Sequence, residues 1–273
     1  MPVDSLHEQK ILILDFGSQY TQNIARRVRE AEVYCEIHPC TKTLKEIEAF
    51  SPTGIILSGG PASVLEQDAV VCDAEVFELG VPVLGICYGM QLIAHLLDGK
   101  VSPADNREYG RAKLCIKEHA HLLNNVNNDS TVWMSHGDRI DKLPAGFKSA
   151  AYTDNSPIAA IENHAKKVYG LQFHPEVVHT NDGVKILDNF LFDICGCTKN
   201  WKIKSLAEYA IEGIRSQVGN GHVVCGLSGG VDSSVVAVLI HKAIGNRLTC
   251  IFIDNGVLRA GERDKVEKTS REN

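Results

Sequence analysis

The sequence predicts an α/β protein in which a mostly parallel central sheet is flanked by helices and is followed by the first βα units of a second, doubly wound α/β domain. Three observations predict this fold. Apolar, strand-like runs alternate with segments of helical spacing, glycine-rich loops follow the ends of those runs, and the alternation resumes after a polar break near residue 198. At roughly 150 residues per domain, 273 residues correspond to about two domains, which we expect at 1–198 and 199–273.

The first elements of the expected sheet are the β-rich run Ile11–Phe16 and the segment Thr21–Ala31, whose apolar residues recur at helical spacing. Two further strands are predicted at Gly54–Leu57 and Val81–Ile86, and a helix at Met90–Leu97. Continuous apolar strands between helices indicate parallel strands that are buried on both faces. Because such sheets bind ligands at the carboxyl ends of their strands, we expect functional residues in the loops that follow these strands.

The pattern changes between Lys113 and His174, where shorter apolar runs indicate a meander of strands. These runs are Thr131–Met134, Pro157–Ile161 and Lys167–Phe173. A helical stripe then covers Gly183–Ile194, and the polar segment Cys195–Asn200 is predicted to end the first domain.

A second βα unit begins with the predicted strand His222–Leu227. A glycine-containing loop follows at Ser228–Ser234, then a helix at Val235–Ile244 and a strand at Leu248–Ile253. Because parallel sheets need several crossover units to cover both faces, about 75 residues hold only the opening of such a domain. We therefore expect the chain to be a truncated part of a longer protein.

Composition and charge argue against several classes of protein. A net charge of −6 lacks the positive excess of a dedicated nucleic-acid binder. The longest apolar stretch, Val81–Leu97, is interrupted by glycine, glutamine and histidine and is too short for a membrane span, and the N-terminus carries no signal-peptide pattern. The nine cysteines lack paired CxxC spacing, which is typical of reduced thiols. These features predict a soluble, cytoplasmic protein.

Gly85-Ile-Cys-Tyr-Gly89 has the form of a nucleophile elbow with cysteine at its centre. A sharp turn from strand to helix strains the backbone of the nucleophile and brings neighbouring chains close, which requires small flanking residues. The turn also sets Cys87 at a helix N-terminus, where the macrodipole favours a thiolate. The amides of Tyr88 and Gly59 are the candidate oxyanion hole. The alternative is a buried structural cysteine beside a tight turn.

The motif His174-Pro-Glu176 favours the catalytic interpretation of Cys87. It follows the predicted strand Lys167–Phe173, and residues two apart on a strand face the same side, so that an imidazole and a carboxylate can be neighbours. Cys87 as nucleophile, His174 as general base and Glu176 as the group that orients the imidazole would form a triad.

Three motifs together resemble the class I, or triad, glutamine amidotransferases over roughly residues 10–195: Ser58-Gly-Gly-Pro61, Gly85-Ile-Cys-Tyr-Gly-Met-Gln91 and Gln172-Phe-His-Pro-Glu176. The resemblance implies an amidotransferase-like fold in which Cys87 attacks the side-chain amide of glutamine, forms a glutamyl thioester and releases ammonia before water hydrolyses the thioester. It also implies which residues hold the substrate glutamine, namely Gln91, Ser135, His136, Gly137 and Asp138. The alternatives are an ordinary helix-surface residue for Gln91 and an ordinary turn for the others.

A second motif, Ser228-Gly-Gly-Val-Asp-Ser-Ser234, follows a predicted strand and opens a helix, the context in which backbone amides bind phosphate. A carboxylate beside phosphate oxygens repels them unless a cation intervenes, so Asp232 is a candidate Mg²⁺ ligand. The candidate pyrophosphate-binding residues are Ser228, Gly229, Gly230, Val231, Asp232, Ser233 and Ser234. The alternative is a glycine-rich turn in which aspartate and serine cap the helix.

This second motif resembles the pyrophosphate-binding loop of the N-type ATP pyrophosphatases, and Cys250-Ile-Phe-Ile-Asp-Asn-Gly256 is similar to the segment of that family that lies beside adenosine. The two resemblances together imply a synthetase that adenylates XMP with MgATP, while ammonia made at Cys87 displaces AMP to give GMP. They imply glutamine, XMP and ATP as partners, no nucleic acid or membrane, and a homodimer formed through a C-terminal domain outside these residues.

Two other functions compete with this one. The loop at 228–234 argues against another class I amidotransferase, such as a subunit serving anthranilate or carbamoyl phosphate synthesis. The other alternative is a glutaminase or ammonia-delivery module that binds nucleotide without synthetase turnover.

Overall fold

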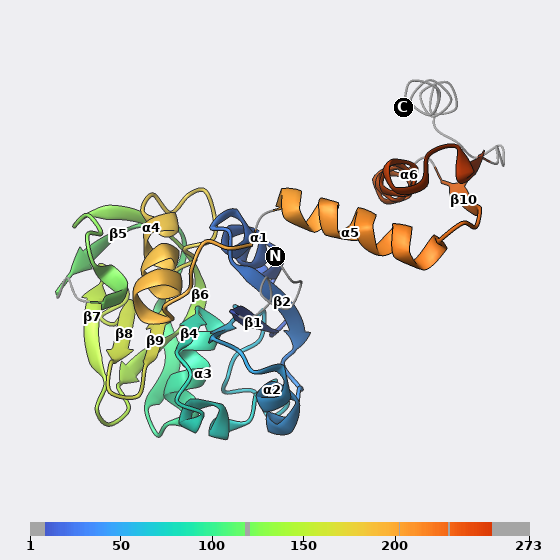
Figure 1. Ribbon diagram of the computed structural model, residues 1–273. Helices are drawn as coiled ribbons and strands as arrows, with labels where there is room; N and C mark the ends of the chain where they lie inside the picture. Colours follow the sequence, from blue (N-terminus) through green and yellow to red (C-terminus); the bar gives the residue numbers. More distant parts are fainter. Residues whose placement is uncertain (1–8, 118–120, 202, 229, 253–273) are drawn as a thin grey trace. The chain divides into compact units, whose positions relative to one another are not determined.

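The computed structural model describes residues 9–117, 121–201, 203–228 and 230–252 (Figure 1). The chain divides into two compact units, Met1–Trp201 and Lys202–Asn273, which are described here one at a time. Among the residues that the structure describes, no helix has both the length and the apolar character that a bilayer crossing requires.

The first unit is built on a nine-stranded sheet in the order β2-β1-β3-β4-β9-β8-β7-β5-β6. Its first five strands run parallel to one another: β2 (Tyr34–Pro39), β1 (Lys10–Asp15), β3 (Gly54–Leu57), β4 (Val83–Ile86) and β9 (Val168–Leu171). The other four continue the sheet as an antiparallel meander: β8 (Ala160–Asn163), β7 (Lys148–Tyr152), β5 (Lys100–Ile116) and β6 (Ser130–Lys142). The α/β class and the change to a meander in the second half are confirmed.

Helices cover both faces of the parallel half of the sheet (Figure 1). Side chains of β1 alternate, so that Ile11 and Ile13 lie in one core and Leu12 and Leu14 in the other. The first core is closed by α1 (Thr21–Glu30), α4 (Gly183–Asp188) and the π-helical segment η4 (Asn189–Ile194). The second is closed by α2 (Leu44–Phe50), the 3₁₀ turn η2 (Ala74–Glu78) and α3 (Tyr88–Leu96). Ile24 of α1 is fully buried, which is worth roughly 1.5–3 kcal/mol relative to exposure.

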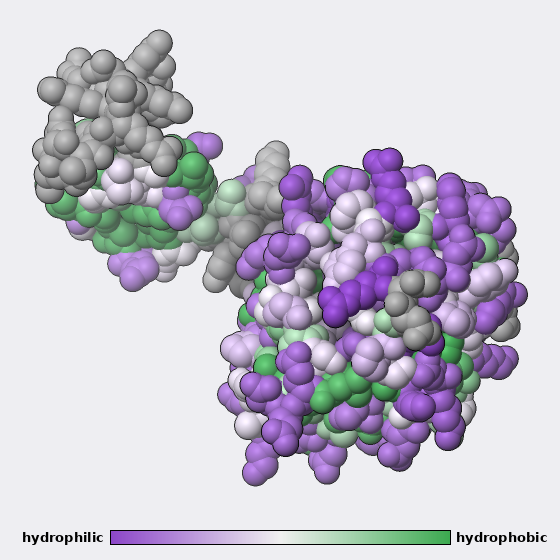
Figure 2. Space-filling view, turned by 180° about the vertical axis from the view of Figure 1, so that it is seen from behind, coloured by the Kyte–Doolittle hydropathy of each residue, from purple (hydrophilic) through white to green (hydrophobic). Residues whose placement is uncertain are grey.

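The second unit contains α5 (Ile203–Val218), β10 (Val223–Leu227), α6 (Val231–Ile244), the 3₁₀ turn η5 (Gly245–Arg247) and β11 (Leu248–Phe252). Strands β10 and β11 are parallel neighbours. Val224, Val231 and Ile251 are 67%, 77% and 48% exposed, and Figure 2 shows apolar side chains gathered on the surface of this unit. Its described residues therefore leave apolar faces uncovered.

Several predicted boundaries are wrong. The strand predicted to reach Phe173 ends at Leu171, and the loop predicted at Ser228–Ser234 is shorter, because α6 already begins at Val231. Elements β2, α2, β7 and α5, and most of β5, had no predicted counterpart. Helix Gly183–Ile194 is continuous, as expected, but its second half is wound as a π-helix.

Candidate active site

The loops that follow β1, β3 and β4 meet at the carboxyl edge of the sheet. Ser58, directly after β3, ties two of them together: its hydroxyl accepts a hydrogen bond from the Phe16 amide (3.0 Å) and donates one to the Gly59 carbonyl (2.8 Å). The third loop carries Cys87, whose amide donates to the Leu171 carbonyl of β9 (2.7 Å). The parallel order of the strands thus gathers three distant sequence motifs.

Cys87 occupies a strained elbow between β4 and α3, with φ 52° and ψ −104°. Such a conformation costs a non-glycine residue about 1–3 kcal/mol, so the surrounding structure must enforce it. The flanking glycines show how. A Cβ on Gly85 would lie 2.5 Å from the backbone of Gly89, and one on Gly89 would lie 2.5 Å from the Leu57 carbonyl oxygen. The helix therefore packs against the strands too closely for any side chain at either position.

His174 and Glu176 are bonded to each other, with Nδ1 of the imidazole 2.7 Å from Oε1 of the carboxylate. They lie in a turn after β9 rather than on a strand, so strand alternation is the wrong reason for their proximity. The turn is held by the His174 amide, which donates to the Trp133 carbonyl (3.0 Å), and by Arg27, whose Nε donates to the Glu176 carbonyl (3.2 Å). The bond at Nδ1 leaves the other ring nitrogen available to a reacting group.

The surroundings of His174 make its imidazole strongly basic. Burial lowers its pKa, but the charge of Glu176 and the hydrogen bonds with Cys87 and Glu176 outweigh burial and hold the pKa well above 6.5. The second carboxylate oxygen of Glu176 is buried and has no hydrogen-bond partner among the described residues, and Oε1 is the oxygen bonded to His174. The Tyr20 ring packs edge-on against the imidazole, with centroids 4.9 Å apart.

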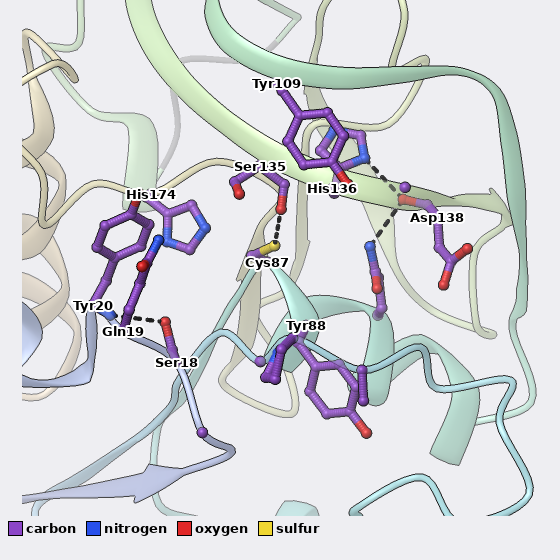
Figure 3. A pocket seen from close by; sticks show the side chains of 16 residues that line it. Ser18, Gln19, Tyr20, Cys87, Tyr88, Tyr109, Ser135, His136, Asp138 and His174 are labelled. Atoms are coloured by element: carbon purple, nitrogen blue, oxygen red, sulfur yellow. Dashed lines mark hydrogen bonds between the residues drawn. The ribbon is translucent and has the colours of Figure 1, made fainter.

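Cys87 and His174 open into one pocket of about 370 Å³, a volume suited to a small polar molecule (Figure 3). Figure 3 shows the Cys87 sulfur pointing toward Ser135, whose carbonyl oxygen is 3.4 Å away. Gln91 projects from α3 toward the same segment of β6 and donates to the Asp138 carbonyl (2.9 Å). The residues that line the pocket are Gly17, Ser18, Gln19, Tyr20, Gly60, Pro61, Ala62, Cys87, Tyr88, Gln91, Tyr109, Ser135, His136, Gly137, Asp138 and His174.

The structure brings together the residues predicted for the glutamine site. Gln91 and all four residues of the Ser135–Asp138 segment line the pocket. Tyr88 also lines it and is the first residue of α3, where a backbone N–H has no partner within the helix. Gly59 is not among the lining residues. It lies against the imidazole, since a Cβ there would be 3.0 Å from Cε1 of His174.

Sequence reasoning missed several residues around the pocket. Tyr20 follows the β1 strand, and Tyr109 lies on β5 beside the pocket mouth. Gln172 belongs to a motif already identified, and its side chain lies between Cys87 (3.8 Å to sulfur) and Gln91 (3.3 Å). The position of Tyr20 in the loop between a parallel strand and its helix was a usable signal, whereas Tyr109 had none.

In the second unit, the turn before α6 is held by its own serines. Ser233 donates from its hydroxyl to the Gly230 carbonyl (3.1 Å) and accepts from the Ser228 amide (3.3 Å), and Ser234 donates to the same carbonyl (2.9 Å). Gly230 is the N-cap and no side chain caps the helix, so capping does not account for Asp232. Gly229 and residues 253–256 of the predicted adenosine segment lie outside the described residues.

Asp232 lies exposed in the first turn of α6. In the part of the chain that the structure describes, no group of three or more histidine, cysteine or acidic residues could hold a metal ion. Mg²⁺ in nucleotide sites commonly takes only one or two carboxylates and fills its other positions with phosphate oxygens and water, so a single Asp232 fits a metal that arrives with a nucleotide.

The fold and the pocket define an α/β protein with a cysteine at a nucleophile elbow beside a histidine–carboxylate pair. A family model described as glutamine amidotransferase class-I matches residues 12–194, and one described as NAD synthase matches residues 204–259. The chain belongs to the class I glutamine amidotransferases.

Relatives agree with this membership. A protein of Acetivibrio thermocellus named glutamine-hydrolysing GMP synthase is 55% identical over 96% of this chain and 52% of its own length, so the chain spans about half the length of the curated relatives it matches. A solved Thermoplasma acidophilum structure, described as that of a candidate GMP synthase subunit, is 31% identical, covers 69% of this chain and 94% of its own, and has a TM-score of 0.62. A Thermotoga maritima glutamine amidotransferase, 19% identical with a TM-score of 0.52 over 87% of this chain and 98% of its own, shares the fold.

Proposed function

We propose that this chain is the amidotransferase unit, together with the first part of the ATP-binding unit, of a glutamine-hydrolysing GMP synthase. The observation that carries the proposal is the presence in one chain of the Cys87 pocket and the Ser228–Ser234 turn, since nucleotide-dependent amination needs both an ammonia source and an ATP site. The name of the 55% identical relative supports it.

The Cys87 pocket would hydrolyse glutamine in two steps. The Cys87 sulfur attacks the side-chain amide carbon while His174 takes the thiol proton, and the tetrahedral oxyanion is held by the amides of Tyr88 and Gly59. The carbon–nitrogen bond then breaks, His174 returns its proton to the leaving group, and ammonia departs from a glutamyl thioester. Water, deprotonated by the same imidazole, hydrolyses the thioester to glutamate and restores the thiol. Glu176 orients the ring and stabilises its charged form.

The substrate glutamine would lie along Gln91 and the Ser135–Asp138 segment, with its side-chain amide at Cys87. These five residues line one pocket of about 370 Å³, which supports this orientation. The Ser135 carbonyl, now 3.4 Å from the thiol, offers an acceptor on the wall where the amino group of glutamine would lie.

The second unit would bind ATP with its pyrophosphate at the N-terminus of α6. The residues proposed for this contact run from Ser228 to Ser234, and Asp232 would hold the Mg²⁺ that accompanies ATP and offsets its phosphate charge. XMP would be adenylated there, and ammonia would displace AMP to give GMP. We further propose a cytoplasmic homodimer that dimerises through a domain outside these residues; nine free cysteines suit a reducing compartment.

The test is to supply the full-length protein with glutamine, XMP and MgATP and to measure GMP, AMP, pyrophosphate and glutamate together. Equal amounts of all four are expected. Glutamate formed without GMP under every nucleotide condition would instead favour the ammonia-delivery module, and the absence of both would contradict the proposal.

A further inference from the structure

A buried polar cluster lies behind the pocket wall and shares only His136 with the residues proposed to hold glutamine. Glu108 of β5 is paired directly across the sheet with His136 of β6, and the two residues are 7% and 4% exposed. The Glu108 carboxylate accepts hydrogen bonds from the hydroxyls of Thr153 (3.0 Å) and Ser156 (2.8 Å) and lies 3.3 Å from Nε2 of His136. The carboxylate thus has two hydroxyl donors and an imidazole as its hydrogen-bond partners.

The second ring nitrogen of His136 faces the Ser135–Asp138 wall of the pocket. This nitrogen, Nδ1, lies 2.9 Å from the Asp138 carbonyl oxygen and must be the donor, because a carbonyl only accepts (Figure 3). The same oxygen accepts the side-chain amide of Gln91 (2.9 Å), which lies one turn after Cys87 on α3. The Asp138 carbonyl is thus bonded both to Gln91 of α3, the helix that follows Cys87, and to His136 of the buried cluster.

Burying a carboxylate is costly unless its hydrogen bonds compensate, so this cluster calls for an explanation. Burial raises the pKa of Glu108, but hydrogen bonds from His136, Ser156 and Thr153 outweigh burial and lower it below 4.5. Thr153 and Ser156 also bond each other through their backbones (2.8 Å), which holds both hydroxyls beside the Glu108 carboxylate.

We propose that Glu108 is a positioning residue for glutamine binding: through His136 it fixes the Asp138 carbonyl, and with it the Ser135–Asp138 wall of the pocket. The inference rests on the proposed glutaminase function and adds to it a residue that contacts neither substrate nor nucleophile. Glu108 acts on substrate affinity, because the Ser135–Asp138 wall that it holds faces the substrate, while the His174–Glu176 pair is held by other contacts.

The test compares Glu108→Ala and Glu108→Gln with a matched control in the full-length protein. Glu162 supplies the control: it is 6% exposed, and its carboxylate lies 3.3 Å from His121, but neither residue lines the pocket. Glu108→Ala should raise the KM for glutamine about tenfold or more while changing kcat by less than about threefold. Glu108→Gln, whose amide can accept from one hydroxyl and donate to His136, should restore KM to within about threefold of wild type. Glu162→Ala should leave KM unchanged, and ammonia-dependent GMP synthesis should be equal in all four proteins.

An unchanged KM in Glu108→Ala, or an equal rise in Glu162→Ala, would overturn the inference while leaving the proposed function intact. A wild-type protein that hydrolyses no glutamine would overturn both. Should Glu108→Ala fail to fold, Thr153→Val and Ser156→Ala decide the matter, since each removes one hydroxyl from the Glu108 carboxylate at little change in volume. Each variant should raise the KM for glutamine about threefold. If the KM stayed unchanged in both variants, the inference would be overturned.

Discussion

His174 binds a proton more tightly than a free imidazole does, although it is buried. Glu176 at 2.7 Å and the neighbouring Cys87 thiol are responsible, and together they outweigh desolvation. An imidazole of this kind is well suited to take the thiol proton in the first step and to hold it until ammonia leaves.

The raised pKa of His174 predicts a pH dependence of stability. Because the folded-state pKa lies above the unfolded value of about 6.5, protonation favours the folded state. The stabilisation should be complete below about pH 6.5 and should be lost as the pH rises through the raised pKa. It is measured as the difference in thermal midpoint between wild type and His174→Gln from pH 5.5 to 9. A difference that widens toward alkaline pH would contradict the assignment.

At the residue scale, the sequence could predict what lies in short contiguous motifs. The position of Cys87 between two glycines and that of His174 two residues before Glu176 together predict a catalytic triad from short spacings in the sequence. Glu108 could not be found in this way, because its partners His136, Thr153 and Ser156 come from two other segments and meet it only across the folded meander.

At the scale of elements, the close approach of α3 to β3 shapes the elbow, and Gly89→Ala tests it. The new Cβ would lie 2.5 Å from the Leu57 carbonyl oxygen, so overpacking should destabilise the first unit by about 1–3 kcal/mol and reduce glutamine hydrolysis. Gly213→Ala in α5 is the control, because among the described residues no atom of another part of the fold lies within 4 Å of the added Cβ, and it should be neutral or stabilising by up to about 1 kcal/mol. Urea unfolding and glutaminase rates check both; equal behaviour of the two variants would count against the packing argument.

Helix α6 begins four residues earlier than its apolar pattern indicates, because Ser233 and Ser234 bond back to the Gly230 carbonyl and extend the helix into the predicted loop. Local hydrogen bonds of this kind leave no trace in hydrophobic periodicity. The same limit applies to His174 and Glu176, which meet through a turn that periodicity reads as strand.

The position of Asp232 in the first turn of α6 predicts a defect common to both nitrogen sources. Asp232→Asn removes the charge proposed to hold Mg²⁺, so GMP synthesis should fall at least about tenfold with glutamine and with ammonia, and excess Mg²⁺ should partly restore it. Steady-state rates over a range of Mg²⁺ concentrations check this. If the Asp232→Asn variant kept the wild-type rate with ammonia at low Mg²⁺, Asp232 would have only a structural role in the turn.

At the scale of the whole molecule, alternation of strands and helices was sufficient to predict the class of fold but not the order of its strands. Strand β9 lies beside β4 (Figure 1), although helix α3 and the whole meander, some eighty residues, separate them in the sequence. This pairing brings the turn that carries His174 next to Cys87. Pairings at such separation are decided by packing in three dimensions, which composition and periodicity do not encode.

The two units should separate on limited proteolysis. Residues up to Trp201 are bonded to the first unit, since the Trp201 amide donates to the Glu32 carbonyl (2.9 Å) and Thr198 is bonded to Gln9 (2.8 Å). Linkers are where few contacts cross, so trypsin should cut first near residues 199–205 and release a stable N-terminal fragment, identified by mass spectrometry. A protected fragment that runs uncut through these residues would contradict the division.

The most direct measurement is GMP synthesis by full-length Cys87→Ala with each of two nitrogen sources. Alanine removes the nucleophile, so glutamine-dependent synthesis should fall to background. Added ammonia bypasses the thioester, so at a pH where free NH₃ is appreciable the same variant should keep most of the wild-type rate. A folded Cys87→Ala protein that still uses glutamine, or that loses both nitrogen sources, would contradict the assignment of glutamine hydrolysis and nucleotide amination to separate sites.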